Sequence, residues 1–192
     1  MVTRLFSFLA FIALVALSFP AAHAACTAPL LDVQFRPLAG KTSVNLCDRF
    51  HGQVLLVVNT ASKCGFTPQY EGLEALHARL KHRGFAVLGF PSNDFMGQEP
   101  DTEEAIREFC TNTYGVQFPM FEKVSVKEGE AVPFYRALAE QAGGRYPGWN
   151  FHKYLISREG IVVANFGSRT TPDDKKLLEA IETELAKSVP ES

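Results

Sequence analysis

The chain has 192 residues, of which 46% are hydrophobic and 16 are phenylalanine, and its formal net charge is −2 at pH 7. This length suits one domain with a sizeable core, and the composition excludes an intrinsically disordered chain. The slightly acidic balance excludes nucleic acid as a partner, because phosphate binding requires a concentrated basic face.

The N-terminal segment has the pattern of a cleaved export signal. Arg4 precedes an apolar run over residues 5–19, and residues 22–24 (Ala-His-Ala) form a small-x-small cleavage site. We therefore expect residues 1–24 to be removed and residues 25–192 to form a single mature domain. The expected location of this domain is outside the cytoplasm, in the periplasm.

Two alternatives to cleavage are disfavoured. A helix that spans a bilayer needs about 20 apolar residues, which is longer than this run, so we expect no stable membrane span. Lipid attachment at Cys26 is disfavoured because His23 stands three places before it, where Leu is usual. Export would also place all four cysteines where disulfides persist. Four cysteines allow three pairings.

Hydrophobic periodicity predicts alternating strands and helices. The expected elements are a buried strand at 54–58, a helix at 70–82, a strand at 85–90, helices at about 101–110 and 132–141, a hairpin of strands at 153–157 and 161–166, and a last helix at about 172–187. The strand–helix–strand unit implies a parallel pair with a right-handed crossover, and the hairpin adds antiparallel strands. This order indicates an α/β, thioredoxin-like fold, with a central mixed β-sheet flanked by helices.

Cys64 lies in a polar loop between a predicted central strand and a predicted helix. Unpaired N–H groups at a helix start and the positive charge of Lys63 both favour the thiolate form, which is the nucleophile. The alternative is a buried, inert cysteine, but a loop that contains Ser62, Gly65 and Thr67 is a poor place for one.

The spacing around Cys64 argues against two groups of thiol enzymes. A dithiol oxidoreductase needs Cys-x-x-Cys, and the position three places after Cys64 holds Thr67. A peroxiredoxin carries Thr or Ser three places before its cysteine, and that position holds Ala61.

Three segments, in order along the chain, resemble the signatures of the glutathione peroxidase family. Residues 59–67 (NTASKCGFT) resemble its nucleophile loop, residues 90–100 (FPSNDFMGQEP) its second signature and residues 149–151 (WNF) its third. The resemblance runs from about residue 30 to residue 187. It implies a thiol-dependent peroxidase that reduces hydrogen peroxide and organic or lipid hydroperoxides, and we expect neither a cofactor nor a metal.

The family's catalytic tetrad of thiol or selenol, Gln, Trp and Asn falls on Cys64, Gln98, Trp149 and Asn150. Peroxide cleavage needs a thiolate together with donors that hold the substrate and help to carry charge to the leaving oxygen. Amide and indole N–H groups are such donors. Taken singly, each of the three has a structural alternative: Gln98 as a surface side chain, Trp149 as a core residue and Asn150 as a turn former.

The second signature departs from the family pattern at three positions outside the tetrad. Ser92 replaces a frequent Cys, Asp94 a frequent Gln and Met96 a frequent Gly. The carboxylate of Asp94 would lie near the site, where it either disfavours the thiolate slightly or caps a turn.

Cys110 resembles the resolving cysteine of two-cysteine members of the family. A sulfenic acid at Cys64 would condense with such a thiol to form a disulfide. Those members are commonly reduced by a thioredoxin-like dithiol protein rather than by glutathione, so the reductant stays open between these two partners. The alternative for Cys110 is a cysteine near a helix end that packs as a small hydrophobic residue.

Cys26 and Cys47 remain, in the N-terminal stretch where family members usually have a β-hairpin. Because the chain is predicted to be exported, we expect a structural disulfide between them. Tetrameric relatives carry a long insertion before the Trp-Asn pair. Here only residues 142–148 separate the preceding helix from Trp149, which favours a monomer with an open site.

Two other functions on the same fold compete with peroxide reduction. A periplasmic thiol–disulfide carrier is disfavoured by Thr67, which stands where a second cysteine would be needed. A non-catalytic protein, such as an accessory component of solute uptake, is disfavoured by the intact tetrad.

Overall fold

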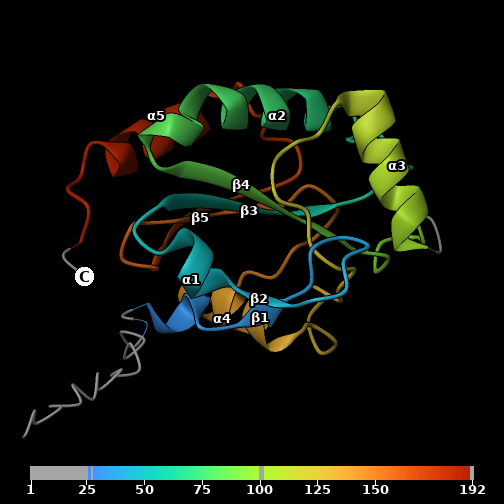
Figure 1. Cartoon of the computed structure of the whole chain (residues 1–192), viewed down its shortest axis with the longest axis horizontal. Coiled ribbons are helices and arrows are strands. Elements are labelled where there is room, and N and C mark those ends of the chain that lie inside the picture. The colour runs from blue at the N-terminus through green and yellow to red at the C-terminus, as the bar shows by residue number, and fades with distance from the viewer. Residues whose placement is uncertain (1–25, 27, 100–101, 191–192) are drawn as a thin grey trace, which may run out of the picture.

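The computed structural model describes residue 26, residues 28–99 and residues 102–190 (Figure 1). The predicted export signal at residues 1–24 lies outside the described residues. Within the described ranges, none of the helices combines the length and the apolar character needed to cross a membrane.

A four-stranded mixed sheet forms the centre of the molecule, with strand order β4-β3-β5-β6. The strands are β3 (Val54–Thr60), β4 (Phe85–Pro91), β5 (Lys153–Ile156) and β6 (Val162–Phe166). Strands β3 and β4 run parallel, whereas β5 pairs antiparallel with both β3 and β6. This arrangement confirms the predicted mixed sheet, with the hairpin added to the strand–helix–strand unit.

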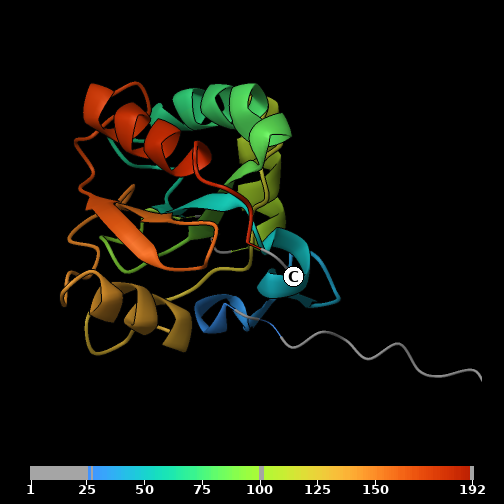
Figure 2. The same cartoon turned by 90° about the vertical axis from the view of Figure 1, so that its left-hand side faces the viewer.

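Helices cover both faces of this sheet (Figures 1 and 2). Helices α2 (Gln69–Leu80) and α5 (Lys175–Leu185) lie on one face, and α4 (Pro133–Gln141) lies on the other. Alternate residues of β3 enter two separate cores: Leu55 and Val57 pack on the side of α4, and Leu56 and Val58 on the side of α2 and α5. Burial on both faces explains why β3 is apolar without alternation.

The N-terminal region contains the expected two-stranded antiparallel hairpin, formed by β1 (Gln34–Phe35) and β2 (Val44–Asn45). A short 3-10 helix precedes it, and helix α1 (Leu46–Phe50) follows directly. Helix α1 was not predicted, although Asn45 is a recognisable N-cap whose side chain accepts a hydrogen bond from the Cys47 N–H. A disulfide joins Cys26 to Cys47, with their Cα atoms 6.1 Å apart.

Two helix boundaries differ from the sequence prediction by three residues or more. Helix α3 (Glu103–Tyr114) continues past the predicted end near Cys110, because the first residue that stops it is Gly115, with φ 62°. Helix α5 begins at Lys175 rather than near residue 172, because Asp174 is the residue whose side chain caps the helix. Cys110 is therefore inside a helix and not at its end.

Candidate active site

The loop that carries Cys64 connects β3 to α2 and is held closed by Thr67. The Thr67 hydroxyl accepts a hydrogen bond from the Cys64 N–H and donates one to the carbonyl oxygen of Ala61, both at 2.9 Å. The Phe66 N–H donates to the Cys64 sulfur at 3.4 Å. Thr67, which argued against a dithiol motif in the sequence, therefore shapes the loop so that a backbone donor faces the sulfur.

Gln98 is tied to this loop and to Asn150. Its carbonyl oxygen accepts a hydrogen bond from the Lys63 N–H at 2.9 Å. Its side-chain oxygen accepts one from the Asn150 amide, also at 2.9 Å. Two predicted tetrad members are thus in direct contact, and one of them is bonded to the residue beside Cys64.

Trp149 and Asn150 lie in a turn that is held in place by Asn59 of β3. The Asn59 amide donates to the Trp149 carbonyl oxygen at 3.2 Å, and its side-chain oxygen accepts from the His152 N–H at 3.1 Å. The Asn59 carbonyl oxygen also accepts from the Phe151 N–H at 2.6 Å. Asn59 was part of the first recognised segment but had no predicted role; its structural role is to hold the Trp-Asn turn.

Trp149 is half-buried and packs against Phe95, with ring centroids 5.5 Å apart. It lies between two surface hollows. One is lined by Phe66, Trp149 and residues 167–170, and the other by side chains that include Phe95, Arg145 and His152. Cys64 and Trp149 also pack into the same hydrophobic cluster. The indole therefore faces open space on the side of the molecule where the Cys64 loop lies.

Glu99 is a buried acid that the sequence did not single out. Its carboxylate accepts hydrogen bonds from both the N–H and the hydroxyl of Ser62, two residues before Cys64. Burial raises the pKa of Glu99 to about 7, against the opposing effect of the Ser62 bonds. Together with the Lys63–Gln98 bond, this pair attaches residues 98–99 to residues 62–63.

Lys153 is a buried amine beneath the Trp-Asn turn. Its ammonium group donates to the Phe151 carbonyl oxygen at 2.7 Å and to the Gln69 side-chain oxygen at 2.8 Å. Burial lowers the pKa of Lys153 to about 7. Lys153 thereby connects the turn that carries Trp149 to the first residue of α2.

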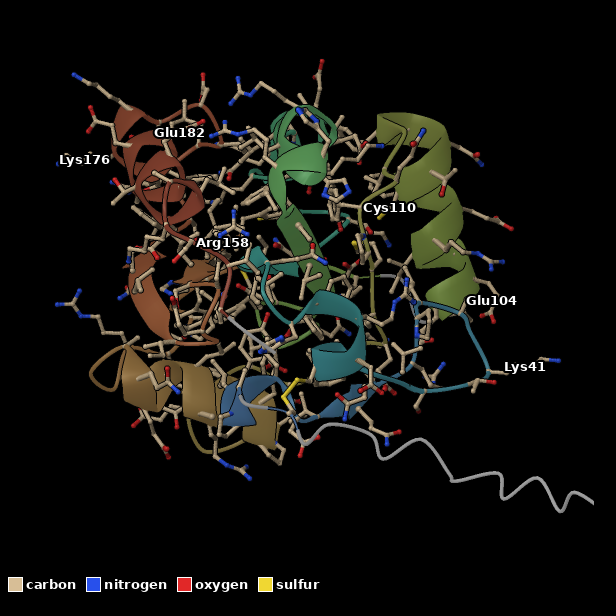
Figure 3. The ribbon with its side chains drawn as sticks, turned by 60° about the vertical axis from the view of Figure 1, so that its left-hand side comes forward. Lys41, Glu104, Cys110, Arg158, Lys176 and Glu182 are labelled. Carbon is tan, nitrogen blue, oxygen red and sulfur yellow. A yellow bond between two sulfur atoms is a disulfide. The ribbon has the colours of Figure 1, made fainter. Side chains whose placement is uncertain are left out.

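Cys110 is only 2% exposed and lies on the side of α3 that faces the interior (Figure 3). Cys64 and Cys110 are both free thiols and belong to the same hydrophobic cluster. Burial raises the pKa of the Cys110 thiol to about 11.

The sequence left two roles open for Asp94, an effect on the thiolate or the capping of a turn, and its contacts favour the second. Its carboxylate accepts hydrogen bonds from the N–H groups of Val126 and Lys127, at 2.6 and 3.0 Å. Asp94 thus caps the turn that begins at Val126 and Lys127. Met96, the other departure, has φ 62°, a conformation in which glycine is favoured.

His152 makes stability depend on pH, because burial lowers the pKa of its imidazole to about 4. The unfolded chain binds this proton near pH 6.5, so stability falls as the pH is lowered from about 6.5 to about 4. When the pH is lowered from 7 to 4, we expect the free energy of unfolding to decrease in both proteins. The decrease should be about 3 kcal/mol larger in the wild type than in His152→Phe. Phenylalanine retains the ring that packs on Tyr154.

Urea unfolding at a series of pH values measures this difference. The opposite contribution of Glu99 is common to both proteins and cancels in the comparison. Parallel loss of stability in the two proteins would contradict the assignment to His152.

The described residues contain no cluster of three or more His, Cys, Asp or Glu side chains that could hold a metal ion. What the geometry brings together is a loop thiol, a backbone donor to its sulfur and a pair of mutually bonded amides.

The fold and the site define a class of protein. The structure is similar to the crystal structure of apo Trgpx, with a TM-score of 0.66 and 33% identity, over 84% of this chain and 98% of that chain. The arrangement is thioredoxin-like, and the Cys64 thiol lies in the loop between β3 and α2 with the Phe66 N–H donating to its sulfur. The class is therefore that of a thiol-dependent oxidoreductase.

Sequence comparison then identifies the family. The model of the family described as "Glutathione peroxidase" matches residues 30–139 of this chain. The hydroperoxy fatty acid reductase of Synechocystis is 49% identical over 65% of this chain and 79% of its own length. The thioredoxin/glutathione peroxidase BtuE of Escherichia coli is 43% identical over 75% of this chain and 91% of its own length. The chain belongs to the glutathione peroxidase family and is a thiol-dependent peroxidase.

Proposed function

We propose that Cys64 is the peroxidatic thiol and that Gln98, Trp149 and Asn150 assist it. The thiolate sulfur attacks one peroxide oxygen, the O–O bond breaks and the leaving oxygen departs with the bonding pair and takes up a proton. Cys64 becomes a sulfenic acid, and the product is water or an alcohol. The observation that carries this proposal is the bonding of the Cys64 loop to Gln98 and, through Gln98, to Asn150.

We propose hydroperoxides of organic and lipid type as substrates beside hydrogen peroxide. The half-buried Trp149 lies next to hollows that are open to solvent and partly lined by aromatic rings, Phe66 on one side and Phe95 on the other. Such apolar surface favours the hydrocarbon part of a substrate. The name of the Synechocystis relative, a hydroperoxy fatty acid reductase, supports this substrate class.

We propose that Cys110 resolves the sulfenic acid and that a dithiol protein then reduces the resulting disulfide. The relative named thioredoxin/glutathione peroxidase supports a dithiol reductant. Cys110 is the eighth of the twelve residues of α3, with four helical residues after it.

The reductant can be identified by turnover measurements with one peroxide and two reducing systems. We expect saturable turnover with thioredoxin and its reductase, and at least about tenfold slower turnover with millimolar glutathione. Cys110→Ser should abolish the thioredoxin-dependent reaction, because the disulfide that thioredoxin attacks no longer forms. Mass spectrometry of the oxidised wild type should find Cys64 bonded to Cys110.

A wild type that accumulates sulfinic acid at Cys64, with no bond to Cys110, would contradict the resolving role. Equal turnover by Cys110→Ser with thioredoxin would contradict it as well. In either case the reaction of Cys64 with peroxide would still stand, since that step needs only one thiol.

We also propose that the protein is exported and acts in the periplasm as a monomer. The Cys26–Cys47 disulfide supports an oxidising compartment. The short connection from α4 to Trp149 supports a monomer with an open site. N-terminal sequencing of the protein from a periplasmic fraction should begin at Ala25, and an intact N-terminus would contradict export with cleavage.

A further inference from the structure

Three segments of the chain that meet around Trp149 are joined by a buried pair of side chains, Gln69 and Lys153. Lys153 is fully buried, and Gln69 is 7% exposed. The Gln69 side-chain oxygen accepts a hydrogen bond from the Lys153 amine at 2.8 Å. The Gln69 amide N–H donates to the Ser168 carbonyl oxygen at 2.6 Å. The pair therefore has two arms, one that leads through Lys153 and one that leads to Ser168.

The Lys153 arm ends at Phe151, the residue directly after Asn150. Phe151 has φ 62°, in the left-handed region, which a residue with a bulky side chain rarely adopts. Such a conformation persists only where the surrounding contacts hold it. The Phe151 carbonyl oxygen accepts from Lys153 at 2.7 Å, and its N–H donates to the Asn59 carbonyl oxygen at 2.6 Å. Lys153 therefore helps to hold the backbone conformation on which the directions of Trp149 and Asn150 depend.

The Gln69 arm ends in the segment over residues 167–170, which contains Ser168. This segment and Phe66 line one of the two hollows beside Trp149, and Ser168 also lines the other. The segment follows the end of β6. The bond from Gln69 thus attaches the wall of these hollows to α2 at a point where strand pairing has ended.

We propose that Lys153 and Gln69 are positioning residues with separate tasks in the reaction of Cys64 with peroxide. Lys153 fixes the turn that presents Trp149 and Asn150, which every peroxide needs. Gln69 fixes the wall against which the organic part of a bulky hydroperoxide packs, and hydrogen peroxide has no such part. This inference rests on the peroxidatic role proposed for Cys64. It assigns selectivity among peroxides to a residue outside the expected tetrad.

Lys153→Met tests the first arm. Methionine is similar in length but has no hydrogen-bond donor, so the Phe151 carbonyl oxygen and the Gln69 side-chain oxygen lose this partner. A displacement of about 1 Å in a group that positions a substrate can cost about a hundredfold in rate. We expect the rate constants for hydrogen peroxide and for cumene hydroperoxide both to fall at least about tenfold. Single-turnover stopped-flow fluorescence of the reduced protein measures them, because Trp149 is the only tryptophan.

Gln69→Glu tests the second arm and leaves the first in place. The carboxylate still accepts the hydrogen bond from Lys153, but it has no N–H to donate to the Ser168 carbonyl oxygen. Two acceptor oxygens repel each other at that distance, so the segment over residues 167–170 moves away from α2. We expect the reaction with hydrogen peroxide to stay close to the wild-type rate. The ratio of the rate constants, hydrogen peroxide over cumene hydroperoxide, should rise at least about fivefold.

Arg158→Lys is a matched control, because Arg158 is a buried cation that follows the other end of β5. Its guanidinium group donates to the backbone carbonyl oxygens of Gly52, Arg83 and Leu185. The single nitrogen of a lysine amine cannot reproduce this planar set of donors. We expect unfolding at a lower urea concentration but unchanged rate constants with both peroxides.

Urea unfolding also verifies that each variant is folded before the rates are compared. Gln69→Glu places a carboxylate at the first residue of α2, where a negative charge is favourable, and beside the Lys153 amine. If Lys153→Met does not fold, Lys153→Gln takes its place, because its side chain keeps an N–H donor but is one bond shorter. Its rate constants with both peroxides should again be lower than those of the wild type.

Three results would overturn the inference. The first is a wild-type rate with hydrogen peroxide in a folded Lys153 variant. The second is a ratio of rate constants in Gln69→Glu that equals or falls below the wild-type ratio. The third is an equal loss of rate in Arg158→Lys and Lys153→Met, which would assign the loss to stability alone. Failure of the proposed function is a different result, since Cys64→Ser would then react with peroxide as fast as the wild type.

Discussion

Replacing Cys64 with serine should lower the second-order rate constant for peroxide consumption by at least about a thousandfold. The serine hydroxyl is not ionised at neutral pH, so the Phe66 N–H that faces position 64 would have no sulfur anion to stabilise. Serine is close in size to cysteine, and the Thr67 hydrogen bonds involve only the backbone of residue 64. The fold should therefore survive, and the loss should be chemical. Stopped-flow mixing of the reduced protein with hydrogen peroxide measures it.

Cys110→Ser is the control for this experiment, since it removes the other free thiol and leaves the first step intact. It should consume one equivalent of peroxide at close to the wild-type rate. Peroxide consumption by Cys64→Ser at the wild-type rate would exclude Cys64 as the peroxidatic residue.

Loss of the Cys26–Cys47 disulfide should lower the free energy of unfolding by about 3 kcal/mol. The two cysteines are 21 residues apart, and the bond restricts the loop between them in the unfolded chain. For a domain of this size, that loss corresponds to a decrease in Tm of roughly 6–12 °C. The variant to test is Cys26→Ser/Cys47→Ser, because replacing both residues leaves no unpaired cysteine at either position. Thermal unfolding of the oxidised proteins measures the difference.

Dithiothreitol provides the matching control. It should bring the Tm of the wild type to that of the double variant treated in the same way, because neither protein then holds any disulfide, including one between Cys64 and Cys110. Equal Tm values for the two oxidised proteins would show that the disulfide does not stabilise the fold. Peroxide consumption in the first step should be unchanged in the variant, because Cys26 and Cys47 pack in the hydrophobic cluster on the α4 side of the sheet, whereas Cys64 packs in the cluster on the other side.

Local sequence patterns predicted most of the fold because its main elements have distinct periodicities. Strands β3 and β4 are short apolar runs, and α2 and α5 carry leucines at helical spacing. Boundaries that depend on one capping side chain were less accurate. Asp174, rather than the residues before it, caps α5, and α3 continues to Gly115 because no residue near Cys110 interrupts it.

The sequence by itself determined the candidate reactive cysteine, the members of the expected tetrad and the two N-terminal cysteines, because each belongs to a local motif or to a small set. Only the tertiary structure decided what surrounds them. Asn59 lies 90 residues before Trp149 and holds its turn, and Glu99 lies 37 residues after Ser62 and binds it. The burial that raises the pKa of Glu99 and lowers that of Lys153 depends on the packing of several elements. Such contacts between distant residues leave no periodicity in the chain, so they become visible only when the sheet and helices are assembled.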